Sequence, residues 1–323
     1  MDTLSKELPC TVLFGNGLNR MTPVNKSWEA LLQDVCKEGV SPLDGKIPNT
    51  LKYEDIYLAD KAEIDTLNRQ HGRSDEYKIK WKIAQASLTL ESNEYYDRLA
   101  RLNVWDYLTT NYDACLNRTL EKYDFKLKGY ESLEKIYSTY RNCTYQSEAF
   151  TKRIWNIHGF AKYPSSIMLG FDQYCGSIAK LKNIQENEHP LTKRLESGQQ
   201  NIFCWADFFY TTNVHILGFS MDFSETDLWW VLSERMHRIK AKQKKGEQTI
   251  HNEIHFYFIS EGKDDRSFET LLQSMGVIVH RYKLNKHLRK NVRWVRLYDQ
   301  IFEEIEGAVG THELTLPEIA PMF

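Results

Sequence analysis

Three short polar segments of this chain contain residue types that could carry chemistry. Asn111 and Asp113 lie in the stretch TTNYD, His158 lies in NIHG, and Gly15 and Gly17 lie in FGNGLN. An imidazole with a pKa of about 6.5 can exchange protons near neutral pH. Glycines let a backbone approach an anion, so that amide N–H groups point at a phosphate. Together these residues predict a site for a phosphate-containing ligand.

Each segment also has a simpler interpretation. A single G-x-G after a strand is usually only a tight turn. Asn111 and Asp113 could cap a helix, and His158 could be a hydrogen-bonded loop histidine. The glycine pattern is not G-x-G-x-x-G, because Arg20 stands at the third glycine position. An ordinary dinucleotide-dependent dehydrogenase is therefore not favoured.

The segments that must position these residues are short apolar runs. Strands are expected at 11–14, 103–108, 153–157, 166–170, 212–217, 254–259 and 277–282, and helices from Ser27, from Asp113, after 224–227, at 268–275 and at 291–305. The stretch 224–227 (SETD) has the form of a capping box. Alternating strands and helices predict an α/β fold, a Rossmann-like, doubly wound and mostly parallel sheet. Ligands of such sheets bind beyond the carboxyl ends of the strands, so the polar segments are expected to meet there.

Two regions interrupt this alternation. Residues of about 40–102 lack β-like periodicity and predict a helical insertion, a small helical subdomain between the first two core strands. A second helical segment is expected at about 172–206, while 123–150 shows no clear period. We expect one domain over 1–310 and a tail over 311–323.

Composition excludes several classes of protein. The 323 residues contain 42 Lys and Arg and 44 Asp and Glu, a formal charge of −2, which gives no indication of nucleic-acid or membrane binding. The basic run 235–245 is interpreted as the solvated end of a helix, so nucleic acid is not expected to bind directly. No two of the six cysteines lie within four residues of each other, so no zinc half-site is expected. Without a visible signal peptide or apolar span, we expect a cytoplasmic protein.

Four segments resemble, in order and spacing, the motifs of sirtuin-like proteins. FGNGLN with the following SWEALL resembles their glycine-rich nucleotide loop, and TTNYD resembles their Q-N-x-D motif, with Thr110 in place of glutamine. NIHG resembles their catalytic His-Gly. The stretch LGFS, with Gly218, Phe219 and Ser220, resembles the glycine–serine loop that holds the dinucleotide.

The departures from sirtuin deacylases point to one branch of the family. The four-cysteine zinc module after the catalytic histidine is absent, and so is the G-I-P-D-F-R element. What remains is similar to the bacterial NAD-hydrolysing branch, which is associated with antiviral defence by NAD depletion. The resemblance implies an NAD+ hydrolase that cleaves the nicotinamide–ribose bond, with NAD as substrate and no zinc.

The resemblance also implies roles for individual residues. Asn111 would bind the nicotinamide ribose and position a water, His158 would hydrogen-bond the ribose hydroxyls or act as general base, and Asp113 would orient the carboxamide or steady the loop. The dinucleotide would be held by Gly15, Asn16, Gly17, Asn19 and Thr110 on one side and by Gly218, Phe219 and Ser220 on the other, with Ser260 and Glu261 near the adenosine ribose.

Two other functions are compatible with these motifs. One is a non-catalytic module that binds NAD or ADP-ribose as a sensor or scaffold, and the other is an NAD-dependent protein deacylase. A toxic hydrolase must be restrained until it is needed. We therefore expect control by homo-oligomerisation or by a partner protein of a defence system.

Overall fold

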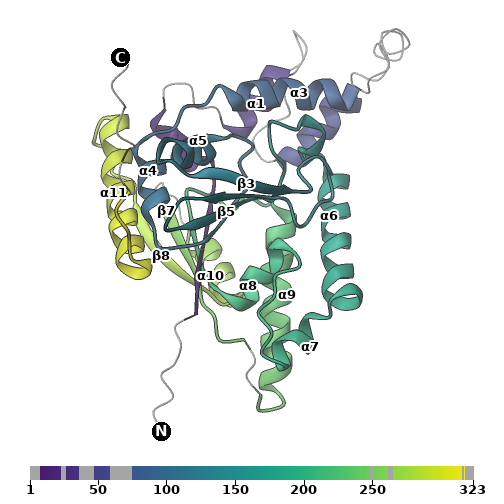
Figure 1. Cartoon of the computed structure of the whole chain (residues 1–323). Coiled ribbons are helices and arrows are strands. Elements are labelled where there is room, and N and C mark those ends of the chain that lie inside the picture. The colour runs from purple at the N-terminus through teal and green to yellow at the C-terminus, as the bar shows by residue number, and fades with distance from the viewer. Residues whose placement is uncertain are drawn as a thin grey trace.

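The computed structural model describes residues 8–22, 27–35, 47–58, 75–247, 250–260, 265–314 and 316. Its centre is an eight-stranded sheet in the order β3-β4-β5-β2-β1-β6-β7-β8 (Figure 1). The strands are β1 (Cys10–Phe14), β2 (Asp106–Thr109), β3 (Lys126–Glu131), β4 (Asn142–Gln146), β5 (Thr151–Asn156), β6 (Asn213–Leu217), β7 (Ile254–Ser260) and β8 (Val277–Lys283).

Six neighbouring strands of this sheet, from β5 through β8, run parallel. Strand β1 lies between β2 and β6, and the chain forms β2 to β5 on one side of it before crossing to form β6 to β8 on the other. This reversal of winding direction is the topological switch point at which open α/β sheets bind ligands. The Rossmann-like α/β prediction is confirmed, and the antiparallel pairs β3–β4 and β4–β5 extend one edge.

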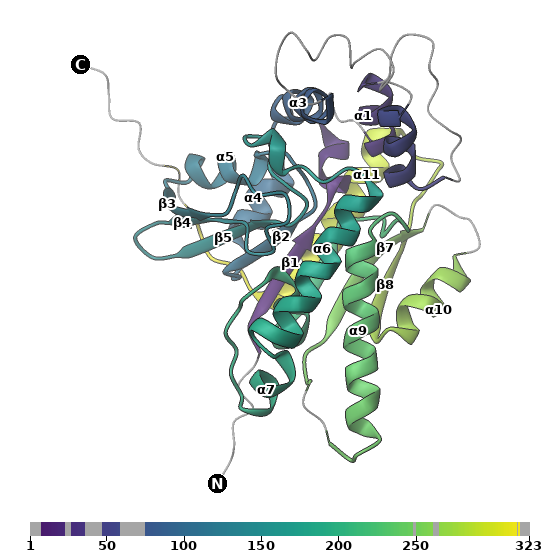
Figure 2. The same cartoon turned by 90° about the vertical axis from the view of Figure 1, so that its right-hand side faces the viewer.

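Helices cover both faces of the sheet, because successive residues of its buried strands point to opposite sides. Val12 and Phe14 of β1 pack with α4 (Glu94–Arg101), α5 (Cys115–Lys122) and α11 (Lys290–Val309). Leu13 packs on the opposite face with α8 (Phe208–Thr211) and α9 (Thr226–Gln243). Figure 2 shows α6 (Phe171–Asn183) and α9 side by side on that second face, with α11 behind the sheet.

A small helical layer lies over the carboxyl ends of the strands. It contains α1 (Trp28–Val35), the helical residues 49–58 and α3 (Asp75–Leu88), which share a core of their own. Figure 1 shows α1 and α3 above the sheet. Helix α4, which was expected in the same insertion, instead packs in the main core beside α11. Within the expected insertion, residues 40–46 and 59–74 lie outside the described residues.

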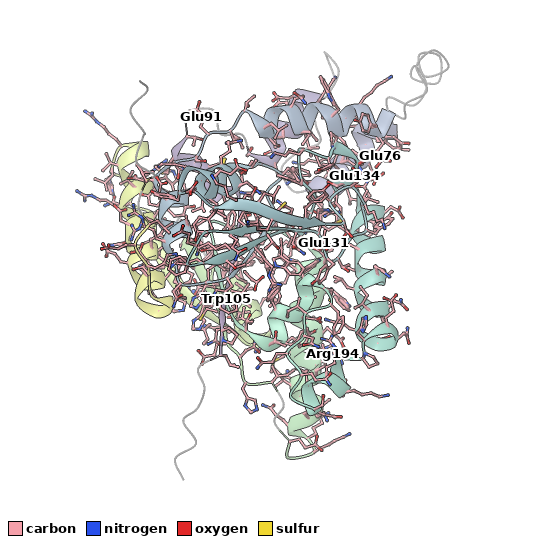
Figure 3. All side chains as sticks on the ribbon, in the orientation of Figure 1. Glu76, Glu91, Trp105, Glu131, Glu134 and Arg194 are labelled. Carbon is pink, nitrogen blue, oxygen red and sulfur yellow. The ribbon has the colours of Figure 1, made fainter. Side chains whose placement is uncertain are left out.

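The second helical segment extends in the opposite direction. It comprises α6, a π-helical turn at Ile184–Glu188, α7 (Leu191–Glu196) and a 3₁₀ turn at Trp205–Asp207. Arg194 of α7 and Glu76 of α3 lie at opposite ends of the molecule (Figure 3). Arg194 is buried and donates to both carboxylate oxygens of Asp207, which fixes α7 to the chain before β6.

One local expectation was wrong, and one stretch without an expected element contains strands. Residues 166–170 do not form a strand: a 3₁₀ turn at Pro164–Ser166 is followed by irregular chain, and Ile167 and Leu169 are buried in the helical layer. A short apolar run is compatible with a buried loop as well as with a strand, so hydrophobic periodicity cannot distinguish the two structures. The stretch 123–150, which had no clear period, contains β3 and β4.

The C-terminal part completes the sheet as expected, with α10 (Arg266–Ser274) between β7 and β8, and α11 after β8. None of the described helices combines the length and the apolar character needed to cross a bilayer.

Candidate active site

Four of the segments singled out in the sequence begin where neighbouring strands end. Phe14, the last residue of β1, is in register with Thr109 of β2 and with Leu217 of β6. Thr109 is in turn in register with Asn156, the last residue of β5. FGNGLN, TTNYD, NIHG and LGFS therefore emerge from one edge of the sheet, at its switch point.

The glycine loop after β1 packs directly against the loop after β6. The amide of Gly15 donates to the carbonyl of Leu217 at 3.1 Å, and the amide of Gly17 donates to that of Gly218 at 2.6 Å. A Cβ atom on Gly17 would lie 2.6 Å from that same carbonyl oxygen, and Gly218 has a φ of +61°. The glycines thus allow the loops after β1 and β6 to touch, and these two amides are used within the protein.

Asn19 joins the glycine loop to the TTNYD segment. Its Nδ2 donates to Asn16 Oδ1 and to Asp113 Oδ2, both at 2.9 Å, and its Oδ1 accepts from the hydroxyl of Tyr96 at 2.7 Å. Asn19 is completely buried. The other oxygen of Asp113 accepts from the amide of Cys115 at the start of α5. Asp113 therefore binds the first amide of α5, next to the N-cap residue Ala114, and also steadies the glycine loop through Asn19.

His158 is buried between two acidic side chains, Asp227 in the first turn of α9 and Glu225 directly before that helix. Its Nε2 lies 3.2 and 3.1 Å from the two carboxylate oxygens of Asp227, which is itself fully buried. Its Nδ1 lies 3.3 Å from Glu225 Oε2 and 3.3 Å from the hydroxyl of Tyr174 on α6. Both nitrogens of the ring therefore face hydrogen-bonding partners.

The charges in this cluster perturb each other. Burial alone lowers the pKa of His158, but the carboxylates of Asp227 and Glu225 together outweigh it and raise the pKa above its ordinary value. Burial raises the pKa of Glu225 to about 7, since the neighbouring His158 only partly offsets the loss of solvation. Titratable groups perturbed in this way cluster at functional sites.

Two buried amides at the same sheet edge have atoms without a hydrogen-bond partner. The backbone amide of Asn111 donates a hydrogen bond to Thr109 Oγ1, but the side-chain Nδ2 of Asn111 has no hydrogen-bond partner among the described residues. Asn156, 1% exposed, has none for either side-chain atom. Unpaired buried polar atoms cost free energy and are rare in folded proteins. These groups fit a site that a polar ligand completes.

The remaining expected residues are spread around this edge. Thr110 lies directly after β2, partly exposed, and Phe219 places its ring over Gly15. Ser220 is exposed. Ser260, at the end of β7, is buried and donates to Asp265 Oδ2 at 2.8 Å. Glu261 lies outside the described residues.

The acidic residues beside His158 were missed because their segment was interpreted as a capping box. Helix α9 begins at Thr226, and Ser224 does not cap it but donates to Asp222 Oδ1 and accepts from the amide of Asn49. Asp227 instead contacts His158. Two acidic residues shortly after the glycine–serine stretch, Glu225 and Asp227, were the sequence feature that could have indicated these partners of His158. Nothing in the sequence indicated Tyr174.

His158, Glu225 and Asp227 form a group that could offer atoms to a metal ion. The two carboxylates, however, contact opposite nitrogens of one ring, and a metal ion can take only one of those nitrogens. The arrangement fits hydrogen bonding to the imidazole better than metal coordination. None of the cysteines that the structure describes belongs to this group.

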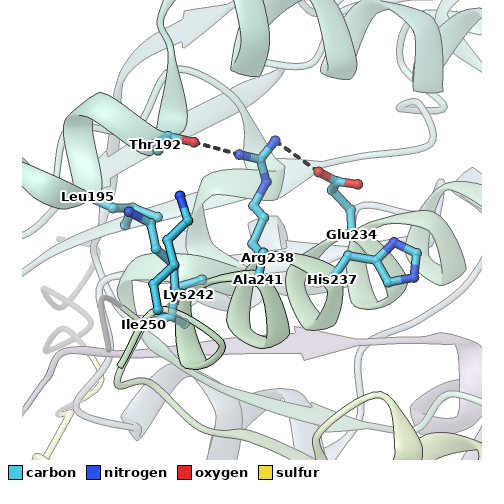
Figure 4. Close-up of a pocket in the computed structure, with 9 residues that line it drawn as sticks. Thr192, Leu195, Glu234, His237, Arg238, Ala241, Lys242 and Ile250 are labelled. Carbon is cyan, nitrogen blue, oxygen red and sulfur yellow. Dashed lines mark hydrogen bonds and ion pairs between the residues drawn. The ribbon is translucent and has the colours of Figure 1, made fainter. Parts of the chain in front are cut away.

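A separate hollow of about 380 Å³ lies between α7 and the C-terminal half of α9. There Arg238 bridges Thr192 and Glu234, both at 2.9 Å (Figure 4). The interpretation of 235–245 as a solvated run is wrong for its first residue, because Arg235 is buried and donates to the carbonyls of Phe209 and Asn252.

Comparison with known proteins identifies the family. No curated protein matches this chain. The family model described as a SIR2-like domain matches residues 106–280, more than half of the chain. The matched region runs from β2 into β8 and contains Asn111, His158 and the loop after β6. The chain is thus a member of the SIR2-like domain family, whose activity is NAD-related.

Proposed function

We propose that this protein is an NAD+ hydrolase that cleaves the bond between nicotinamide and ribose, giving nicotinamide and ADP-ribose. The observation that carries the proposal is the buried His158, flanked by Asp227 and Glu225, at the same sheet edge as the unpartnered amide of Asn111. Positive charge develops on the ribose as nicotinamide leaves. Carboxylates held in a poorly solvated site favour such charge.

The site also fits the polarity of a dinucleotide, and it lies at a switch point of the sheet. Strand ends from β1, β2, β5 and β6 contribute to one edge, and Asn111 and Asn156 retain hydrogen-bonding capacity for ribose hydroxyls or a carboxamide. In this proposal Gly15, Gly17 and Gly218 shape the loops around the diphosphate, and the exposed Ser220 contacts it.

The biological role proposed for this activity is antiviral defence by NAD depletion. Such an enzyme would act on the cytoplasmic NAD pool and would be held inactive by self-association or by a partner protein. A non-catalytic NAD or ADP-ribose sensor and a protein deacylase are the alternatives, and each predicts a different outcome with NAD alone.

The test is NAD turnover by the purified full chain, with the mass of the particle recorded in solution. We expect nicotinamide and ADP-ribose to appear in equal amounts, and His158→Ala and Asn111→Ala each to lower the rate at least ~100-fold. Folding is checked by circular dichroism. If the protein binds NAD without cleaving it in every oligomeric state found in solution, the result would favour the sensor. If nicotinamide is released only when an acyl-lysine peptide is added, the result would favour the deacylase.

A further inference from the structure

The two acidic residues beside His158 differ in accessibility. Asp227 is completely buried and sits against Nε2, whereas the Glu225 side chain is 20% exposed and sits against Nδ1. Part of the Glu225 side chain is open to solvent, although its Oε2 is buried, whereas Asp227 is wholly enclosed. The two carboxylates are therefore suited to different tasks.

The ring between them is poorly suited to accept a proton. The Asp227 carboxylate can only accept, so Nε2 carries a proton, and the negative charge of Glu225 at 3.3 Å from Nδ1 favours a proton on that nitrogen as well. The raised pKa of His158 agrees with that form. An imidazolium cannot take a further proton from water. His158 thus serves as a hydrogen-bond donor, and a base must be found elsewhere.

Resting on the proposed NAD hydrolysis, we propose that Glu225 is a catalytic residue that takes the proton from the attacking water, while Asp227 is a positioning residue that orients His158. Glu225 Oε2 has no hydrogen-bond partner among the described residues, although it lies 3.3 Å from His158 Nδ1. Glu225 directly precedes α9, in the loop that follows Gly218–Ser220, and thus lies at the same edge as the amide of Asn111.

The surroundings of Glu225 support this role. Its pKa of about 7 keeps a substantial fraction ionised near neutral pH while leaving it basic enough to accept a proton. The titratable and charged groups around it come from several elements. They are His158 after β5, Asp227 on α9, Asp222 in the preceding loop, Tyr174 on α6 and Tyr112 after β2, with Arg141 acting on His158.

The chemical step balances without any further reactant. The water oxygen bonds to the anomeric carbon of the nicotinamide ribose as the bond from that carbon to the nicotinamide nitrogen breaks. The bonding electron pair leaves with nicotinamide, which becomes neutral, and one water proton passes to Glu225. Release of that proton to solvent restores the carboxylate, so the products are nicotinamide, ADP-ribose and one proton.

The experiment compares Glu225→Gln, Glu225→Ala and the control Glu234→Gln, a glutamate of α9 that pairs with Arg238. We expect Glu225→Gln to lower kcat at least ~100-fold with KM changed less than ~5-fold, and the fall in wild-type kcat/KM on the acid side of pH 7 to disappear. Glu234→Gln is expected to retain wild-type kcat. Circular dichroism and ADP-ribose binding verify that the variants are folded.

Sodium azide separates a base from a structural role. Azide attacks without losing a proton, so it should restore nicotinamide release by Glu225→Ala at least ~10-fold and give azido-ADP-ribose, detected by mass spectrometry. Wild-type kcat in Glu225→Gln, or a folded, ADP-ribose-binding Glu225→Ala that azide does not restore, would overturn the assignment. Absence of hydrolysis by the wild-type chain would instead contradict the proposed function.

Discussion

Asp227 directs both of its carboxylate oxygens at Nε2 of His158, at 3.2 and 3.1 Å, and neither residue is exposed by more than 2%. The contact joins the first turn of α9 to the end of β5, across 69 residues of sequence. A charge-assisted hydrogen bond of this kind fixes the ring orientation and favours its protonated form. The histidine at the centre of the site is thus held by a residue on another element.

Replacing the carboxylate of Asp227 should change the pKa of His158 while leaving the fold intact. We expect Asp227→Asn to lower the pKa of His158, since a neutral amide no longer stabilises the imidazolium, and to lower kcat by ~10- to 100-fold. The pKa is measured by NMR of the labelled imidazole, and Asp299→Asn on α11, beside Arg98, serves as control. An unchanged imidazole pKa in Asp227→Asn would show that the contact does not govern its charge.

The glycine loop offers a matched pair of substitutions. A Cβ atom on Gly17 would lie 2.6 and 2.7 Å from the carbonyl oxygen and Cα of Gly218, whereas one on Gly129 of β3 would meet nothing within 4 Å. We expect Gly17→Ala to separate the two loops, lowering stability by ~1–3 kcal/mol and NAD affinity at least ~10-fold. Gly129→Ala should leave both the stability and the NAD affinity unchanged within experimental error. Calorimetric titration and denaturant unfolding measure the two effects, and equal behaviour of the pair would contradict the steric argument.

The sheet and the meeting point of the polar segments were predictable because their causes are local. The runs 11–14, 212–217 and 254–259 are apolar and end in polar or glycine residues, so the strand ends and the edge that they share follow from short stretches of sequence. By contrast, β3 (KLKGYE) is almost entirely exposed and carries no apolar alternation. Its strand conformation depends on pairing with β4, which the sequence does not reveal.

The partners of His158 could not be predicted for a related reason. The S-x-x-D pattern of 224–227 is compatible both with a helix cap and with acids directed into a site, and only the position of β5 beside β2 decides between them. Tertiary contact, rather than local preference, determines what Asp227 binds. The same limit applies to Tyr174. Its sequence context indicates only a helix, and its contact with His158 depends on the packing of α6 beside α9.

Asn19 should prove to be a structural residue of the site. Its side chain hydrogen-bonds Asn16, Asp113 and Tyr96 at once, so Asn19→Ala removes a hydrogen bond from one oxygen of the buried Asp113 carboxylate and another from the buried Tyr96 hydroxyl. We expect a loss of ~2–4 kcal/mol in the free energy of unfolding, and ~1 kcal/mol for Tyr96→Phe, which removes a single hydrogen bond. Urea titration measures both. A stable Asn19→Ala that loses NAD binding would instead indicate direct contact with the ligand.

The last prediction concerns pH and follows from the sign of the Glu225 shift. The pKa of Glu225 is raised from 4.5 to about 7, so the folded state binds its proton more tightly than the unfolded state does. The contribution of the protonated Glu225 side chain to stability is fully present below pH 4.5 and is lost as pH rises to about 7, a change of about 3 kcal/mol at 1.36 kcal/mol per pKa unit. His158, whose pKa is also raised, loses its contribution in the same direction as pH rises.

The substitution Glu225→Gln tests this dependence, because glutamine mimics the protonated side chain at every pH. We therefore expect it to match the wild type in free energy of unfolding at pH 4.5 and to exceed it by ~2–3 kcal/mol at pH 8, in urea titrations at both values. A difference between the two proteins that is independent of pH would show that the carboxyl group of Glu225 has an ordinary affinity for its proton.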